Sequence, residues 1–129
     1  MIPPPIRQAL FLEIHRAIEE AAKACVASIL SPDEATLAYP PGGTLTETER
    51  AALRQLAVSP DARAALEKLT ADACSYPFFH LFAVMDGVAD PETDVGEWPG
   101  ITLEPKQEGD EEMLHDEFFE SYWDYKEGR

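Results

Sequence analysis

The stretch that decides the fold is Ile6–Leu30, which reads IRQALFLEIHRAIEEAAKACVASIL. Apolar and small residues recur in it at steps of three and four, the spacing of one face of an α-helix. Pro5 suits the first helical position, and Ser31-Pro32 ends the pattern. The sequence therefore predicts a long N-terminal helix over residues 6–30. The residues of its apolar face are Ile6, Leu10, Ile14, Ile18, Ala21, Cys25 and Ile29.

Start signals predict two further helices. Residues 38–43, AYPPGG, are a loop, and the pair Thr46 and Glu49 after it has the spacing of a capping box. Ser59-Pro60-Asp61 combines a cap, a first-turn proline and an acid near the positive helix end. We expect the second helix to turn Leu53 and Leu56 inward. We expect the third to present Ala62, Ala65, Leu66, Leu69 and Ala73 to the core.

The segment after the third helix is almost entirely apolar. Tyr76-Pro77 should break or kink the helix, and residues 78–85, FFHLFAVM, should then be buried. Periodicity does not separate a helix from a buried strand in so short a run. The spacing of Phe78, Phe82 and Met85 and the stop Asp86-Gly87 favour a helix. A buried strand over 78–85, which would make the fold α+β, is the alternative.

Residues 86–109 are rich in Gly, Pro and acids and predict a structured loop with a short strand over 101–104. A last helix should run from Asp110 to Lys126, with Gly128 as its stop. The expected fold is mainly α: one domain over residues 1–129, built as a bundle of four or five helices. Its expected core contains Ile14, Ile18, Leu66, Leu69, Phe82 and Phe118.

The charge is concentrated in the last third of the chain. The 129 residues carry 25 Asp and Glu against 10 Lys and Arg, a formal net charge of −15. Residues 1–85 have a net charge of −3, and residues 86–129 have a net charge of −12. An acidic surface repels phosphate, so we expect no nucleic acid or membrane as partner.

The sequence also predicts a cytoplasmic location. Its two cysteines are expected to be buried free thiols, and it has no leader-like segment.

The loop Asp86–Glu97 resembles a calcium-binding loop in composition only. Acids stand at its first, fifth, seventh, ninth and twelfth positions. The sixth position, which needs glycine, is Pro91, and the third is Val88, which supplies no ligand. We therefore expect no tight metal binding there, although a Ca²⁺-binding module or a metal-dependent hydrolase that uses these acids is the alternative.

No other motif predicts catalysis or a cofactor. The histidines His15, His80 and His115 lack metal-ligand spacing, and we expect His80 in the core and His115 half-buried. Neither Cys25 nor Cys74 has a cationic neighbour in sequence that would lower the pKa of its thiol. The sequence predicts no catalytic residue, no metal ligand and no cofactor.

The last helix has two different sides. Aromatic residues cover one half, as expected for core packing, and acids gather in an arc of about 100° opposite them. Asp116–Glu120 and Glu120–Asp124 are like-charge pairs four residues apart, each unfavourable by about 0.2–0.5 kcal/mol. A helix selected for stability alone would alternate the signs of its charges. The concentration of acid therefore indicates a surface for a positively charged partner.

These features predict a non-enzymatic acidic protein-binding domain, an inhibitor or adaptor that docks on a basic protein through its acidic C-terminal third. In size and charge the chain is similar to bacterial immunity and antitoxin proteins, without a shared motif. The pattern does not predict the oligomeric state. The predicted partner-binding acids are Asp116, Glu117, Glu120 and Asp124, with Asp90, Glu92, Asp94 and Glu97. Exposed aromatics, Trp98 or Trp123, would add short-range specificity.

Overall fold

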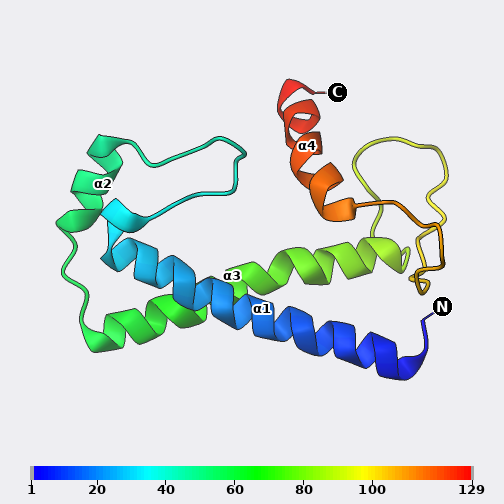
Figure 1. The fold of residues 1–129 in the computed structure, drawn as a ribbon, viewed down its shortest axis with the longest axis horizontal. Coiled ribbons are helices and arrows are strands. Elements are labelled where there is room, and N and C mark those ends of the chain that lie inside the picture. The colour runs from blue at the N-terminus through cyan, green and yellow to red at the C-terminus, as the bar shows by residue number, and fades with distance from the viewer. Residues whose placement is uncertain (1, 129) are drawn as a thin grey trace. The chain divides into compact units, whose positions relative to one another are not determined.

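The computed structural model describes residues 2–128, and it is mainly helical (Figure 1). Its elements in chain order are α1 (Pro4–Leu30), the 3-10 helix η1 (Pro32–Glu34), α2 (Glu47–Arg54), α3 (Pro60–Met85) and α4 (Leu114–Glu127). Residues 2–128 contain no strand. The mainly α prediction with its long N-terminal helix is confirmed. The predicted short strand over 101–104 and the α+β alternative are wrong.

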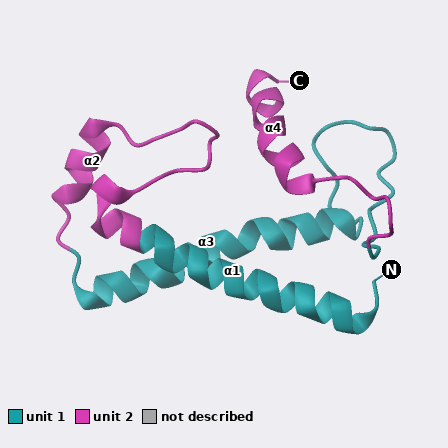
Figure 2. Cartoon of the chain, in the orientation of Figure 1, with its two compact units in different colours: residues 1–26, 58–105 teal, residues 27–57, 106–129 magenta. Residues whose placement is uncertain are grey.

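The chain divides into two compact units (Figure 2). Unit 1 combines residues 1–26 with residues 58–105, so it holds most of α1 and all of α3. Unit 2 combines residues 27–57 with residues 106–129, and it holds η1, α2 and α4. The assignment of residues 1–129 to one domain stays a prediction.

In unit 1, α1 and α3 pack in antiparallel directions. Near the start of α1, the ring of Phe11 meets that of Phe82 edge to face, with 5.4 Å between centroids. Farther along α1, the buried Ala22 lines the same hollow as Ala64 and Ala71 of α3. The C-terminal part of α3 thus lies beside the N-terminal part of α1.

The buried stripe of α1 differs from the predicted face by one position. Its buried residues are Ile18, Ala22 and Val26, which follow one another at two steps of four residues. The predicted core positions Ala21 and Cys25 are exposed. Four residues span slightly more than one helical turn, so a stripe built only from steps of four winds slowly around the helix. Val26 therefore lies on the buried stripe, whereas Cys25 lies beside it and faces outward. The expectation of a buried Cys25 is therefore wrong, and Cys74 is half-buried.

The caps of α2 and α3 are confirmed. The Glu49 amide donates to Thr46 Oγ1 at 3.1 Å, and the Thr46 amide donates to Glu49 Oε1 at 2.8 Å. These bonds lower the pKa of Glu49, mainly through the Thr46 backbone. At α3, the Ala62 amide donates to Ser59 Oγ at 3.1 Å. Each cap satisfies amides that the first helical turn leaves without a partner.

Of the break or kink expected at Tyr76-Pro77, the break does not occur, because α3 continues to Met85 with Pro77 inside it. A proline removes one amide donor, and the rest of this long helix keeps its own hydrogen bonds. The rings of Tyr76 and His80 stack across this turn, 6.3 Å apart and nearly parallel. The predicted helical state of residues 78–85 is confirmed, as is the stop, since Asp86 is the C-cap and Gly87 has φ +74°.

The expected single core is not formed. Of its six predicted members only Ile18 is buried; Ile14, Leu66 and Phe82 are half-buried, and Leu69 and Phe118 are exposed. Leu56, Phe79 and Leu81 are also exposed rather than inward. The reason in α3 is that the helix is apolar on more than one side, so contact with α1 covers only one of them.

Candidate protein-binding surface

Helix α4 begins four residues later than predicted, because the residues before it form a turn. The Gln107 amide donates to Asp110 Oδ2 at 2.7 Å, and the Asp110 amide donates to the Gln107 carbonyl at 3.1 Å. Lys106 Nζ donates to the Glu112 carbonyl at 3.3 Å. The side chain of Asp110 is thus used in a turn and does not start the helix. The predicted stop is confirmed, with Gly128 left-handed at φ +75°.

The four predicted acids of α4 are all exposed. Asp116 and Glu117 lie in the first turn, where they complement the positive end of the helix dipole. His115 Nε2 lies 3.4 Å from Asp116 Oδ1 at the surface. Among the described residues no ion pair engages Glu117 or Glu120. Glu117 and Glu120 therefore present negative charge that no ion pair among the described residues neutralises.

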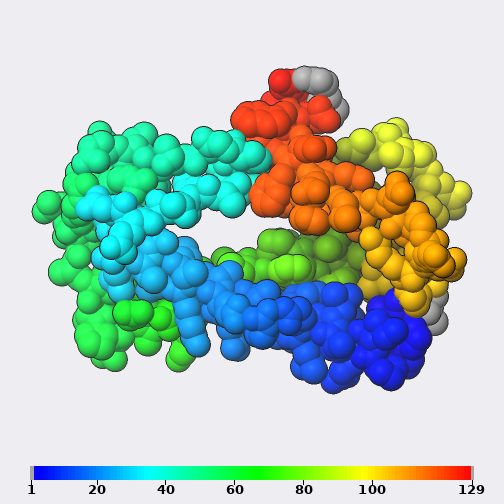
Figure 3. All heavy atoms as spheres, in the orientation of Figure 1, coloured from blue at the N-terminus to red at the C-terminus, as the bar shows by residue number. Residues whose placement is uncertain are grey.

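The aromatic half of α4 is largely exposed, contrary to the expected core packing. In Figure 3 the atoms of α4, coloured orange to red, lie open to the viewer. Phe118 keeps 62%, Trp123 53% and Tyr125 73% of its surface. Only Tyr122 is half-buried, because its ring meets Tyr39 edge to face at 5.2 Å. The helix thus offers aromatic rings as well as carboxylates.

A shallow pocket lies on this aromatic half within unit 2. It is lined by Tyr39, Phe118, Ser121, Tyr122 and Tyr125. The Lys126 ammonium lies 5.9 Å from the Tyr122 ring centre and 5.7 Å from that of Tyr125, within the range of a cation–π contact. The rings therefore already attract one cation of the chain itself.

The loop acids Asp90, Glu92, Asp94 and Glu97 are exposed and belong to unit 1, whereas the α4 acids belong to unit 2. Asp94 Oδ1 accepts from the Gly96 amide at 2.9 Å, a local turn contact. No group of three or more His, Cys, Asp or Glu side chains within residues 2–128 is placed to hold a metal ion. Asp90, Glu92 and Asp94 line one small hollow of the loop, and Glu97 does not line it.

Trp98 is not the exposed aromatic that the sequence suggested. Its ring is half-buried, and its indole N–H donates to the Val84 carbonyl at 2.7 Å. Nearby, the Ile101 amide donates to the Met85 carbonyl at 2.8 Å. These two bonds hold the loop against the C-terminal end of α3. Trp123, at the surface of α4, is the tryptophan available to a partner.

The histidines also lie differently from the expectation. His80 and His115 are both exposed rather than buried or half-buried. His80 sits on a side of α3 that α1 does not cover, and His115 is next to the first turn of α4. Neither is held among apolar side chains.

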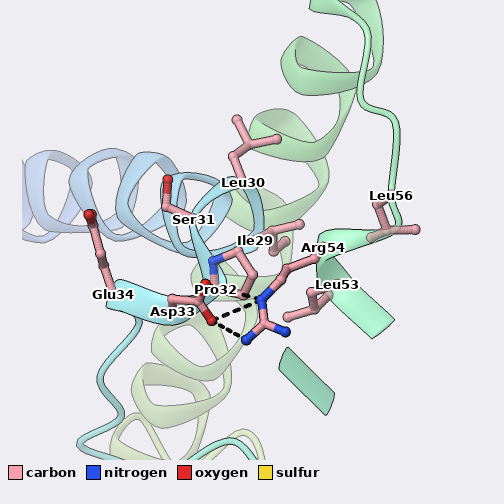
Figure 4. A pocket seen from close by; sticks show the side chains of 9 residues that line it. All are labelled: Ile29, Leu30, Ser31, Pro32, Asp33, Glu34, Leu53, Arg54 and Leu56. Atoms are coloured by element: carbon pink, nitrogen blue, oxygen red, sulfur yellow. Dashed lines mark hydrogen bonds and ion pairs between the residues drawn. The ribbon is translucent and has the colours of Figure 1, made fainter. Parts of the chain in front are cut away.

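A contact that sequence analysis missed fastens η1 to α2 in unit 2 (Figure 4). Arg54 donates from Nε and Nη2 to the Asp33 carboxylate, at 3.0 Å and 2.5 Å, and also reaches Glu47. One turn earlier, Arg50 donates to the carbonyls of Pro32 and Ala35. The hydrogen bond from Arg54 lowers the pKa of Asp33, and Asp33 and Glu47 raise that of Arg54.

The two arginines are four residues apart, so they lie on one side of α2. The hollow beside Arg54 has a volume of about 350 Å³, and apolar residues such as Ile29 and Leu53 line it together with Asp33, Glu34 and Arg54. Because Arg54 is engaged by two carboxylates, its guanidinium serves this junction rather than an incoming anion. We assign the hollow a structural role.

Compared with protein-family models, with curated proteins and with solved structures, the chain matches none. Within the described residues, no helix combines the length and apolar character that crossing a bilayer requires. The surface of the chain itself is therefore what bears on its function.

Proposed function

We propose that this chain is a non-enzymatic protein-binding domain that docks on a basic protein through its acidic C-terminal third. The observation that carries the proposal is the side of α4 on which Asp116, Glu117 and Glu120 are exposed and make no ion pair with a lysine or arginine of residues 2–128. Like charges at one-turn spacing cost helix stability. A binding function would explain why that cost is kept.

The two sides of α4 have complementary roles in this proposal. The carboxylates attract a basic partner over a distance and raise its association rate. The exposed rings of Phe118 and Trp123 supply short-range contact, as aromatic residues do at the centre of protein interfaces. The loop acids Asp90, Glu92, Asp94 and Glu97 add to the field of the acidic segment.

An inhibitor or adaptor of the immunity type fits this surface. Such a protein covers a positively charged site on its partner, and a nuclease that binds phosphate is a protein of that kind. We place the function in the cytoplasm, where free thiols such as those of Cys25 and Cys74 remain reduced.

The test reverses charge on α4. The partner is captured from native lysate, eluted with a salt gradient and purified, and its association rate with the chain is measured at several salt concentrations. Glu117→Lys with Glu120→Lys should slow association and flatten its salt dependence, because the steering field weakens. Folding should be unchanged or slightly improved, since like-charge repulsion is relieved.

The matched control is Glu19→Lys with Glu34→Lys, which makes the same change in net charge at exposed acids outside the acidic segment. It should leave most of the association rate intact. If both double variants bind the partner as fast as the unaltered chain at low salt, the acidic side of α4 serves solubility and the proposal is wrong. Equal slowing by both variants would mean that net charge, and not this helix, attracts the partner.

A further inference from the structure

Helix α3 carries an apolar stripe that α1 does not cover. We define the α3 stripe as the residues Ala65, Leu69, Ala73, Tyr76 and His80. They follow one another at steps of three or four and so share one side of the helix. All five are exposed, and Leu69 and Tyr76 each keep 67% of their surface. The α1-facing residues, such as Ala71 and Phe82, lie on the opposite side of the helix.

An apolar side of a helix is normally covered by another element, and this side of α3 is not. Phe79, 73% exposed, adjoins the α3 stripe and enlarges it. With aromatic side chains of about 150–250 Å² each, the stripe and Phe79 expose on the order of 500 Å². That is at the upper end of the largest apolar patch of a typical monomer and is most of the roughly 800 Å² that each partner contributes to a stable interface.

We propose that a second copy of this chain covers the α3 stripe, so that α3 pairs with its symmetry mate. The charge of this part of the chain favours a like partner over a basic one. Helix α3 itself has two basic and three acidic side chains, a net charge of −1, and the stripe holds no Asp, Glu, Lys or Arg. Two copies of this helix meet with little repulsion, whereas the helix offers a basic protein little attraction.

The α3 stripe also has the pattern that a two-fold interface needs, because such an interface must be complementary to itself. Ala65 and Ala73 alternate with larger side chains, which leaves spaces for Leu69 and Tyr76 of the second copy.

The test is the mass of the purified full chain by sedimentation equilibrium at micromolar concentration. We expect twice the chain mass of 14.3 kDa, falling toward 14.3 kDa on dilution. Leu69→Asp should give the single-chain mass at the same concentration, with the helical circular dichroism retained. Leu69→Ala, which keeps the helix former and removes only the contact, should raise the dissociation constant about tenfold or more.

Leu114→Asp is the matched control, since Leu114 is a leucine of similar exposure on α4. It should leave the dimer intact. A single-chain mass for the unaltered protein would overturn the proposal. So would a dimer that survives both Leu69 variants, or one lost in Leu114→Asp and kept in Leu69→Asp.

Discussion

The indole of Trp98 gives the most direct test of how the loop after α3 is held. The substitution Trp98→Phe keeps an aromatic ring and removes the indole N–H that donates to the Val84 carbonyl at 2.7 Å. That carbonyl also accepts from the Gly87 amide at 3.1 Å, so it is not left without a partner. The cost is therefore the net value of one hydrogen bond, about 0.5–1.5 kcal/mol, rather than a full desolvation penalty.

The smaller ring also gives up some buried apolar area, which at about 25 cal/mol per Å² adds a few tenths of a kcal/mol. The expected loss is about 1–2 kcal/mol in the free energy of unfolding. With an unfolding entropy of about 2.1 cal/mol/K per residue, the melting temperature should fall by about 4–7 °C. Thermal and urea melts followed by far-ultraviolet circular dichroism measure both quantities.

Trp123→Phe is the matched control, since Trp123 is the only other tryptophan and is 53% exposed on α4. It should change stability by no more than about 0.5 kcal/mol. If Trp98→Phe were as stable as the unaltered chain, the bond to Val84 would contribute nothing net, and the loop would be held by other contacts. Equal losses in the two variants would mean that ring size, and not the indole donor, sets the cost.

Two further predictions concern the same loop and the η1–α2 junction. Gly100→Ala should destabilise by about 1–3 kcal/mol in urea melts, because Gly100 has φ +79° and an added Cβ would lie 2.7 Å from the Met85 carbonyl oxygen. Arg54 lowers the pKa of Asp33, so the stability from this pair is present above the ordinary aspartate pKa, about 3.9, and is lost as pH falls through the lower folded value. Thermal midpoints between pH 7 and pH 2 should show this acid loss, and Arg54→Ala should reduce it.

Signals contained within three or four residues of sequence were sufficient to predict the helix ends. The caps at Thr46 and Ser59 and the stop at Asp86-Gly87 depend on hydrogen bonds between near neighbours. The predicted start of α4 at Asp110 was wrong because of another local hydrogen bond. The Asp110 side chain accepts from the Gln107 amide in a turn and so does not start the helix. A Gly109-Asp110 pair after Gln107 is a turn signal that would have shifted the prediction.

Contacts between residues that are far apart in the sequence could not be predicted. The donor in Trp98 and the acceptor in Val84 are separated by 14 residues, and Arg54 and Asp33 by 21. No local pattern pairs them, because the fold and not the spacing brings them together. The exposed acids of α4 could be predicted, since carboxylates gathered on one side of a helix are rarely buried. The exposure of the aromatic side could not, because rings at helical spacing are typical of a core.

Helix α3 shows why periodicity alone does not identify a core. The stripe of Ala65, Leu69 and Ala73 has the spacing of a buried face, yet the contact with α1 lies on the side of Ala71 and Phe82. A helix with two apolar sides satisfies the pattern twice, and the sequence contains nothing that ranks one side above the other. Hydrophobic spacing therefore predicts that a residue avoids water, but not whether the same chain or a second one covers it. For α3, the small net charge of the helix itself, −1 over residues 60–85, is what favours a second copy, because it causes little repulsion between two copies and offers a basic partner little attraction.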